Sequence, residues 1–361
     1  MFKRVISVLL FIGLIISSCA TDDESYGLDD PTQKFNDTYK LISEKAEIDE
    51  SYITGPTQIL VVDSLLIVND HFEDQGETYF FGLFDKKSGE LYRRFGREGR
   101  GPDEFLDNSF LFHTSTESGN VIANNRRLFS ITEISLEKVL EDSGTFTVDQ
   151  VDGLNNRYSM VSKISDNLFF GTGTFENGRF ALSDTSGTLI NTSINYPFED
   201  EFDDISTRDL GMAYQSSFSF HPTEPLVAVA IFTAANLDIL RVENDNIQEI
   251  SQVHSYPPKF ENQSSETQIS VMFDAENRMG YWDIDVTEEY IYTLYSGRER
   301  TDPNQSTGNK VFVFDWEGNP IKQLNLDVEV SRIAVDQNNE TLYAVANDDN
   351  NEALIVSFSL D

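Results

Sequence analysis

The chain has 361 residues, of which 39% are hydrophobic and 12% aromatic, so it is long enough to bury a large core. Its 62 acidic residues outnumber its 26 lysines and arginines, which gives a formal net charge of −36. Such a charge repels phosphate backbones, and we therefore expect no nucleic-acid partner. The single cysteine, Cys19, rules out an internal disulfide and a cysteine cluster for zinc.

The N-terminus has the order of features found in a bacterial lipoprotein signal. A short basic region precedes an apolar run over residues 5–16, which is too short to span a bilayer. The following Ile16-Ser17-Ser18-Cys19 resembles the bacterial lipobox, and this resemblance implies cleavage before Cys19 and its lipidation. We therefore expect residues 1–18 to be a signal peptide and the lipid chains to hold the protein on a membrane. A small buried cysteine in an ordinary signal peptide is the alternative.

The residues behind Cys19 bear on location. Ala20, in place of an aspartate, resembles outer-membrane sorting, and Asp22-Asp23-Glu24 resembles the export signal of surface-exposed lipoproteins in the Bacteroidetes. These resemblances imply an outer-membrane lipoprotein of the cell envelope, displayed at the surface or facing the periplasm. Residues 19–37 are polar and lack hydrophobic periodicity, which predicts a flexible tether.

From residue 38 onward the chain repeats one unit, in which a strand, a tight polar turn and a second strand apolar on both faces follow one another. The clearest unit spans residues 280–327, and its four predicted strands lie at residues 281–286, 290–295, 310–315 and 320–326. The second strands of six such units are predicted to begin at residues 65, 121, 168, 226, 290 and 341. This spacing predicts an all-β fold over residues 38–361, a six-bladed β-propeller with four antiparallel strands per blade.

Closure of the ring requires one more strand. The last unit supplies only three strands, and a closed ring must pair its remaining edge. Residues 38–48 precede the first unit and have no other partner, so we predict that they complete the sixth blade. A helix over residues 41–50 is the alternative, because Ser43-Glu44-Lys45-Ala46 suits one. In the irregular second unit, residues 135–142 are predicted to be helix or loop.

A glycine-rich loop, Gly96-Arg97-Glu98-Gly99-Arg100-Gly101, follows a predicted strand. The next residues do not begin a helix, so no helix N-terminus would face a phosphate, and the glycines are not ordered as in dinucleotide or P-loop motifs. A turn between two blades, on one face of the ring near the channel mouth, is the favoured interpretation. Four cations are concentrated here and either face an anionic ligand or pair with nearby carboxylates: Arg93, Arg94, Arg97 and Arg100.

Other catalytic and metal-binding patterns are weak. No G-x-S-x-G motif is present, and Asp- and Asn-rich turns at residues 336–339 and 347–350 are also what hairpins favour. The four histidines lack metal-ligand spacing: His71, His113, His221 and His254. We therefore predict no cofactor, no metal and no catalytic residue.

Two stretches are distinctive in combination. FGREGRGPDEF at residues 95–105 is the first, and LYSGR at residues 294–298 with VFDWEGNP at residues 313–320 is the second. Through these two stretches the chain resembles the TolB-like six-bladed propeller lipoproteins of Bacteroidetes, whose loop after the first blade reads G-x-x-G-x-G-P-x-E-F. The resemblance extends over roughly residues 38–361. The resemblance implies a propeller fold and an envelope location, and it brings no established reaction.

We therefore expect a lipid-anchored envelope propeller without catalytic activity, one face of which binds a protein or a glycan. The alternative is a calcium-dependent hydrolase of the lactonase type, with carboxylate and amide ligands converging on a metal in the channel. A purely structural scaffold is the third possibility, and it would show neither a channel pocket nor an exposed apolar patch.

Overall fold

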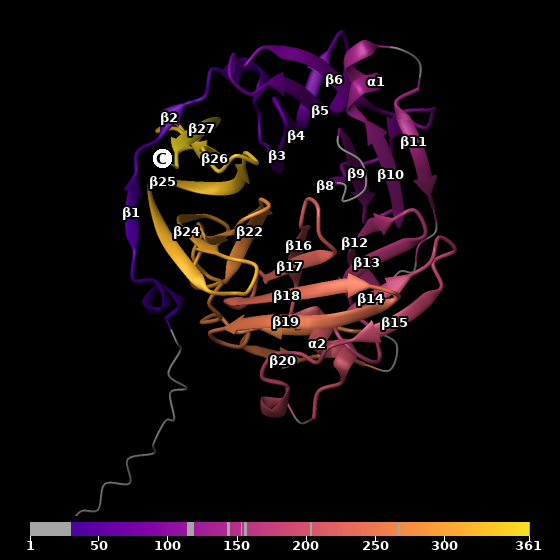
Figure 1. Cartoon of the computed structure of the whole chain (residues 1–361), viewed down its shortest axis with the longest axis vertical. Helices are drawn as coiled ribbons and strands as arrows, with labels where there is room; N and C mark the ends of the chain where they lie inside the picture. The colour runs from indigo at the N-terminus through magenta and orange to yellow at the C-terminus, as the bar shows by residue number, and fades with distance from the viewer. Residues whose placement is uncertain are drawn as a thin grey trace, which may run out of the picture.

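The computed structural model describes residues 30–113, 119–142, 145–152, 154, 157–202, 204–265 and 268–360; the expected signal peptide and Cys19 lie outside them. Viewed down its shortest axis, the molecule is a ring of sheets around a central axis (Figure 1). The sheets form six four-stranded blades, as predicted. The fifth and sixth blades are joined in one continuous eight-stranded sheet.

The first three blades follow one another along the chain, and the strands of each are arranged in sequence order from the axis outward. Blade 1 consists of β3 (Gln58–Val62), β4 (Leu65–Asp74), β5 (Glu77–Asp85) and β6 (Leu91–Glu98), with β7 (Glu104–Phe105) added in parallel. Blade 2 consists of β8 (Phe110–His113), β9 (Asn120–Asn125), β10 (Ser130–Ser135) and β11 (Thr147–Val151). Blade 3 consists of β12 (Tyr158–Ser165), β13 (Leu168–Gly173), β14 (Phe180–Ser183) and β15 (Leu189–Ser193).

The last two of the remaining three blades share one long strand. Blade 4 consists of β16 (Ser216–Phe220), β17 (Leu226–Ile231), β18 (Asn236–Glu243) and β19 (Asn246–His254). Blade 5 consists of β22 (Tyr281–Val286), β23 (Ile291–Tyr295), β24 (Gly308–Phe314) and the first half of β25 (Pro320–Val335). The second half of β25 begins blade 6, which continues through β26 (Thr341–Asn347) and β27 (Ala353–Ser359). The six second strands all begin within one residue of their predicted positions.

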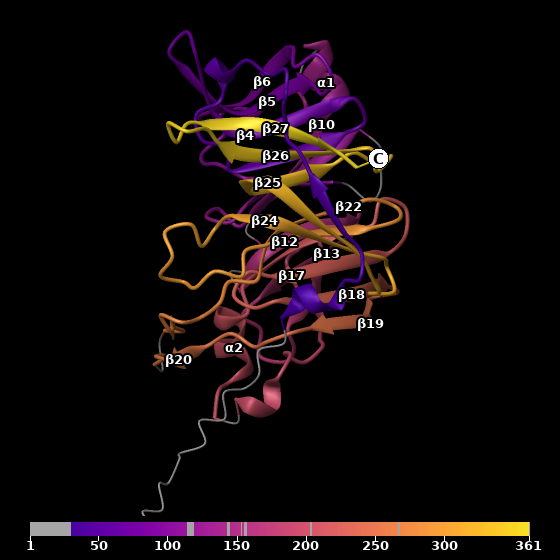
Figure 2. The same ribbon diagram turned by 90° about the vertical axis from the view of Figure 1, so that its left-hand side faces the viewer.

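Helices and a small extra sheet decorate the ring. The irregular segment at residues 135–142 contains α1 (Leu136–Glu141), in line with the helical option. Between blades 3 and 4 lie η3 (Glu199–Glu201) and α2 (Thr207–Ala213), and between blades 4 and 5 lie β20 (Phe260–Asn262) and β21 (Val271–Phe273). In the side view α2 and β20 lie close together (Figure 2). None of the helices in the described ranges is long and apolar enough to cross a membrane.

Residues 30–48 form an N-terminal strap that runs along the outside of blades 5 and 6 (Figures 1 and 2). Within the strap, β2 (Glu44–Lys45) pairs antiparallel with β27 and completes blade 6, as predicted. The preceding β1 (Thr38–Leu41) instead pairs in parallel with β25 and adds a fifth strand to blade 5. The helical alternative for residues 41–50 is wrong, since only a short 3-10 turn, η2 (Glu50–Tyr52), follows.

The strap begins earlier than the sequence predicted. Residues 31–35, expected to belong to the tether, form η1 (Pro31–Lys34) and then pack onto blade 5. Phe35 is buried and stacks on Phe312, with ring centroids 4.7 Å apart. Lys34 donates a 2.7 Å hydrogen bond from Nζ to the carbonyl oxygen of His254. The described part of the tether is thus fixed to the ring.

The core lies between neighbouring sheets. Every residue of β17 is buried, as expected for a strand covered on both faces. Near the axis, Phe112 of blade 2 stacks on Phe218 of blade 4, with ring centroids 4.9 Å apart. Phe170 of blade 3 meets Phe218 edge-on at 5.2 Å. Three consecutive blades therefore share one aromatic cluster.

The inner edges of the blades are joined through side chains. An inner strand has no neighbouring strand on its axial side, so its backbone groups there need other partners. The side-chain amide of Gln58 in β3 accepts a 2.8 Å hydrogen bond from the N–H of Leu111 in β8. It also donates a 2.7 Å hydrogen bond to the carbonyl oxygen of Leu111. Arg332 of β25 donates a 2.5 Å hydrogen bond from Nε to the carbonyl oxygen of Thr57, next to β3.

Two aspartates serve the same purpose between blades 5 and 6. Asp283 accepts a 2.8 Å hydrogen bond from the N–H of Ile333, and Asp285 accepts one of 2.7 Å from the N–H of Val335. Loss of hydration raises the pKa of Asp283 to about 6 and that of Asp285 to about 7. Both carboxyls therefore keep their protons to higher pH in the folded chain than in the unfolded chain.

We expect Phe35→Ala to lower the free energy of unfolding by about 3 kcal/mol, because it removes a buried ring from the strap. Tyr39→Ala is the matched control, since Tyr39 lies in β1 with 52% of its surface exposed, and it should cost less than about 1 kcal/mol. Urea denaturation measures both. Equal, small losses would show that the strap does not stabilise the ring.

We expect Asp285→Asn to stabilise the protein at pH 8 but not at pH 5. The stabilising contribution of a carboxyl with a raised pKa is complete below about pH 4 and is lost as pH rises toward 7. Asparagine keeps an acceptor for Val335 and cannot ionise, so the gain at pH 8 should be on the order of 2 kcal/mol.

Urea denaturation at both pH values measures this gain. Asp348→Asn is the control, because the pKa of the Asp348 carboxyl is lowered and not raised. Hydrogen bonds from backbone N–H groups, chiefly that of Glu352, cause this lowering. The control should give no gain at pH 8. Equal destabilisation by Asp285→Asn at both pH values would contradict the raised pKa.

Candidate functional site

The glycine-rich loop is shaped around Glu104. Gly96 has a φ of +66°, and a Cβ at this position would lie 2.6 Å from the ring of Phe81. A Cβ on Gly99 would collide with the Glu104 carboxylate. Glu104 folds back under the loop, where it accepts a 2.6 Å hydrogen bond from the N–H of Gly101. Each of these glycines thus makes room that no other residue type would leave.

The chain beyond the loop is a strand and not a helix. β7 pairs in parallel with β6, and its Phe105 packs edge-on against Phe81 at 5.5 Å. Asp103 accepts hydrogen bonds from the N–H groups of Phe146 (3.2 Å) and Thr147 (2.8 Å), which fastens the loop to blade 2. No helix begins directly after the loop, so the geometry of a phosphate-binding loop is absent from this described segment.

The structure keeps three of the four arginines together and sets Arg100 apart from them. Three of them lie on β6, at the outer edge of blade 1 rather than near the channel mouth. Each of the three has a carboxylate partner: Arg93 pairs with Asp142, Arg94 with Asp74 (3.4 Å), and Arg97 with Glu77 (3.2 Å) and Glu104. Arg100, in the loop itself, has no ion-pair partner among the described residues.

Carboxylates balance the cations at this edge. A cavity of about 260 Å³ is lined by the three paired arginines and Lys138, and also by Asp103, Glu104 and Asp142. The hydrogen bond from Arg97, supported by the N–H of Gly101, holds the pKa of Glu104 below its usual range. Arg93 therefore holds the C-terminal end of α1 and Arg97 holds the loop against blade 1, while Arg94 pairs within blade 1. These pairs leave little positive charge for an anionic ligand.

A larger concavity lies between the loop and blade 2. This loop groove has a volume of about 720 Å³ and is formed on one side by residues 99–106. Its other lining residues come from blade 2 and the segments next to its strands: Ser109, Asn125, Leu128, Ser130, Thr132, Thr145, Thr147 and Gln150. Hydroxyl and amide groups predominate in this lining. A volume of this size is typical of ligand pockets.

The floor of the loop groove carries buried hydroxyl groups. Ser109, Ser130 and Thr132 are only 3%, 6% and 8% exposed. The Ser109 oxygen is fully enclosed and has no hydrogen-bond partner among the described residues. The hydroxyls of Ser130 and Thr132 are not among the enclosed unpaired atoms, so they are open to the groove, where a ligand or ordered water can bind them. Leu106 and Leu128, 44% and 43% exposed, form an apolar rim.

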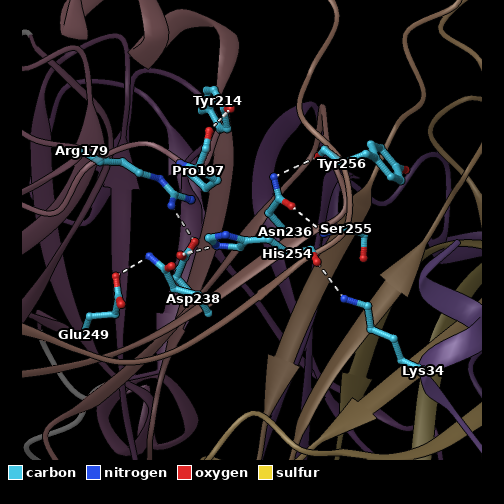
Figure 3. Close-up of polar contacts among 11 residues, drawn as sticks. Lys34, Arg179, Pro197, Tyr214, Asn236, Asp238, Glu249, His254, Ser255 and Tyr256 are labelled. Atoms are coloured by element: carbon cyan, nitrogen blue, oxygen red, sulfur yellow. Dashed lines mark hydrogen bonds and ion pairs between the residues drawn. The ribbon is translucent and has the colours of Figure 1, made fainter. Parts of the chain in front are cut away.

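A buried ionic group joins blades 3 and 4 (Figure 3). Arg179, just before β14, pairs with Asp238 of β18 at 2.6 Å, and both side chains are inaccessible to solvent. His254, at the end of β19, contacts the other Asp238 oxygen at 2.9 Å. Burial alone would raise the pKa of Asp238, but Arg179 and His254 outweigh it and hold that pKa low. Arg179 also covers the ring of Phe180, its neighbour in blade 3, at 4.7 Å, and its ion pair with Asp238 links blade 3 to blade 4.

Histidines and carboxylates do not assemble into a metal site in the described part of the chain. His221 accepts hydrogen bonds at Nδ1 from the N–H groups of Thr223 (3.1 Å) and Glu224 (2.9 Å), so it caps a turn. Within the part of the chain that the structure describes, no group of three or more His, Cys, Asp or Glu side chains is placed to hold a metal ion.

The loop could be located from the sequence, but the hydroxyl floor that it covers could not. Ser130 and Thr132 are two residues apart in β10 and therefore face the same side of blade 2. Serine and threonine on a strand with no charged neighbour at the same face were the available signal. It is weak, because the same residues occur on solvent-exposed sheet faces.

Comparison with known proteins agrees with this architecture. A family model described as TolB-like 6-blade propeller-like matches residues 34–338. A solved structure of a DUF4221 family member from Bacteroides vulgatus is 14% identical, with a TM-score of 0.54 over 90% of this chain and 96% of that one. Raptor from Chaetomium thermophilum is 11% identical, with a TM-score of 0.46 over 92% of this chain and 30% of that one.

Among curated proteins, none matches the chain significantly by sequence. The family match covers most of the chain, and the resemblance noted in the glycine-rich loop is confirmed. The chain belongs to the TolB-like six-bladed propeller family.

Proposed function

We propose that this protein is a lipid-anchored binding module of the bacterial cell envelope, which holds a protein or glycan ligand in the loop groove. The observation that carries the proposal is the loop groove itself, a concavity of about 720 Å³ whose floor carries the hydroxyls of Ser130 and Thr132. The glycines, Asp103 and Glu104 hold the loop in place, so the groove is formed before a ligand arrives.

The strap supports an anchored arrangement. Lipidation of Cys19 would leave residues 20–29 between the lipid and the first residues packed on the ring. Ten residues reach at most about 35 Å when fully extended. The strap enters the ring beside blades 4 and 5, whereas the loop groove belongs to blades 1 and 2 on the opposite side (Figure 1). The groove would therefore lie at the part of the ring farthest from the anchor point.

The chemistry of the groove favours binding over catalysis. No histidine lines it, and its two carboxylates are already engaged. Asp103 accepts two backbone hydrogen bonds, and Glu104 pairs with Arg97. A serine or threonine hydroxyl without an adjacent base is a weak nucleophile. These groups are suited to hydrogen bonding with a ligand.

We expect Cys19→Ala to release the protein from the membrane fraction, because alanine cannot accept the lipid chains that anchor the chain. Cell fractionation and metabolic labelling with a fatty acid measure the effect in cells that express the full-length chain. Ser18→Ala is the control, since it keeps a small residue before the cysteine and should remain membrane-bound. Retention of the unlabelled Cys19→Ala protein on the membrane would contradict lipid anchoring.

We expect a photo-reactive amino acid at position 106 to capture an envelope component in intact cells, because Leu106 lies on the rim of the loop groove. Position 190 is the matched control, since Ile190 is 43% exposed, close to the 44% of Leu106, but lies on the outer strand of blade 3. Gel shift and mass spectrometry identify the adducts. Identical adducts from both positions, or none from position 106, would contradict a ligand at the groove.

A further inference from the structure

We infer that the ligand of the loop groove is a neutral saccharide, bound through its hydroxyl groups. This inference rests on the proposed function, because it assumes that the groove holds a ligand. The floor of the groove has the hydrogen-bonding capacity that such a ligand needs. Ser130 and Thr132 each offer a hydroxyl that can both donate and accept. A sugar hydroxyl has the same dual capacity, so two neighbouring sugar hydroxyls can bind both.

The charge of the lining also favours a neutral ligand. Arg100 is the one cation among the lining residues, while Asp103 and Glu104 contribute two carboxylates. The whole chain carries a formal charge of −36, so a polyanion would approach against repulsion. A cationic ligand is also disfavoured, because both carboxylates already have donors within the protein. The remaining lining is neutral, and it fits a neutral ligand.

The shape of the groove and its apolar rim suit sugar rings. A groove of about 720 Å³ has room for a short oligosaccharide. Leu106 and Leu128 would pack against the C–H faces of sugar rings while the Gln150 amide binds a ring edge. A folded protein partner usually inserts aromatic or arginine anchors into deep pockets and meets similar residues around them. Apart from buried Phe105 and the lone Arg100, the lining offers no such anchors.

The test uses the full-length protein in a detergent without sugar groups. It is titrated with a pool of neutral oligosaccharides and, separately, with polygalacturonate as an anionic glycan. We expect saturable binding of the neutral pool. Thr132→Val and Ser130→Ala should each weaken it about 3- to 10-fold, because each removes one neutral hydrogen bond to the ligand.

Two matched controls separate binding from folding. Thr172 and Ser162 are also buried on strands with unpaired hydroxyls, but they belong to blade 3 and do not line the groove. Thr172→Val and Ser162→Ala should change binding less than about two-fold. Thr132→Val should leave the midpoint of urea unfolding unchanged or raised, because it removes a buried hydroxyl that has no partner within the described protein. A hydroxyl with a merely structural role would lower stability and binding together.

Three outcomes would overturn the inference. Tighter binding of polygalacturonate that is lost in Arg100→Ala would make the ligand anionic. Absence of neutral binding, with a protein adduct from position 106, would make the ligand a protein and leave the proposed binding role intact. Absence of any saccharide binding and of any adduct specific to position 106 would remove both the inference and the proposed function.

Discussion

The inner edge of each blade is the constraint on which the ring depends. Backbone groups on that edge have no neighbouring strand, and leaving them unpaired would cost free energy at every blade. The chain meets this need with side chains that reach from one inner strand to the next, such as Gln58 to Leu111 and Asp285 to Val335. These bonds fix the angle between neighbouring blades. The strap acts at the outer edges, where β1 and β2 pair with β25 and β27.

The need to pair backbone polar groups also explains where the loop groove lies. The connection from blade 1 to blade 2 must cross from an outer strand back to the axis. Glycines let it fold around Glu104, and Asp103 fastens it to the N–H groups at the start of β11. Since Asp103 is engaged by the N–H groups of Phe146 and Thr147, the hydroxyls of Ser130 and Thr132 beneath the loop stay available to the groove. The contacts of Glu104 and Asp103 that hold the loop in place thus also form one side of the groove.

The fold was predictable from the sequence because each blade of a propeller has the same pattern of apolar strands and polar turns. Six apolar second strands, each at a regular spacing, placed six blades, and the unpaired last blade placed β2. The packing of Phe35 was not predicted, because one aromatic residue in a polar stretch resembles a tether. For the site, the loop was found from its glycines. The groove was not, because its two sides are the loop and blade 2, whose packing together no sequence pattern indicates. The arginines were placed at the channel mouth, although Arg93, Arg94 and Arg97 lie on β6 toward the outer edge of blade 1.

Closure of the ring is tested most directly by native-state hydrogen exchange at the backbone N–H groups of Ile333 and Val335. On this inner edge of blade 6, both donate to carboxylates of blade 5. If those bonds hold the blades together, both amides should exchange only with the free energy of global unfolding, as we also expect of the amides between β26 and β27. Faster exchange at Ile333 and Val335, while the β26–β27 amides stay protected, would show that blades 5 and 6 separate independently and would contradict the account.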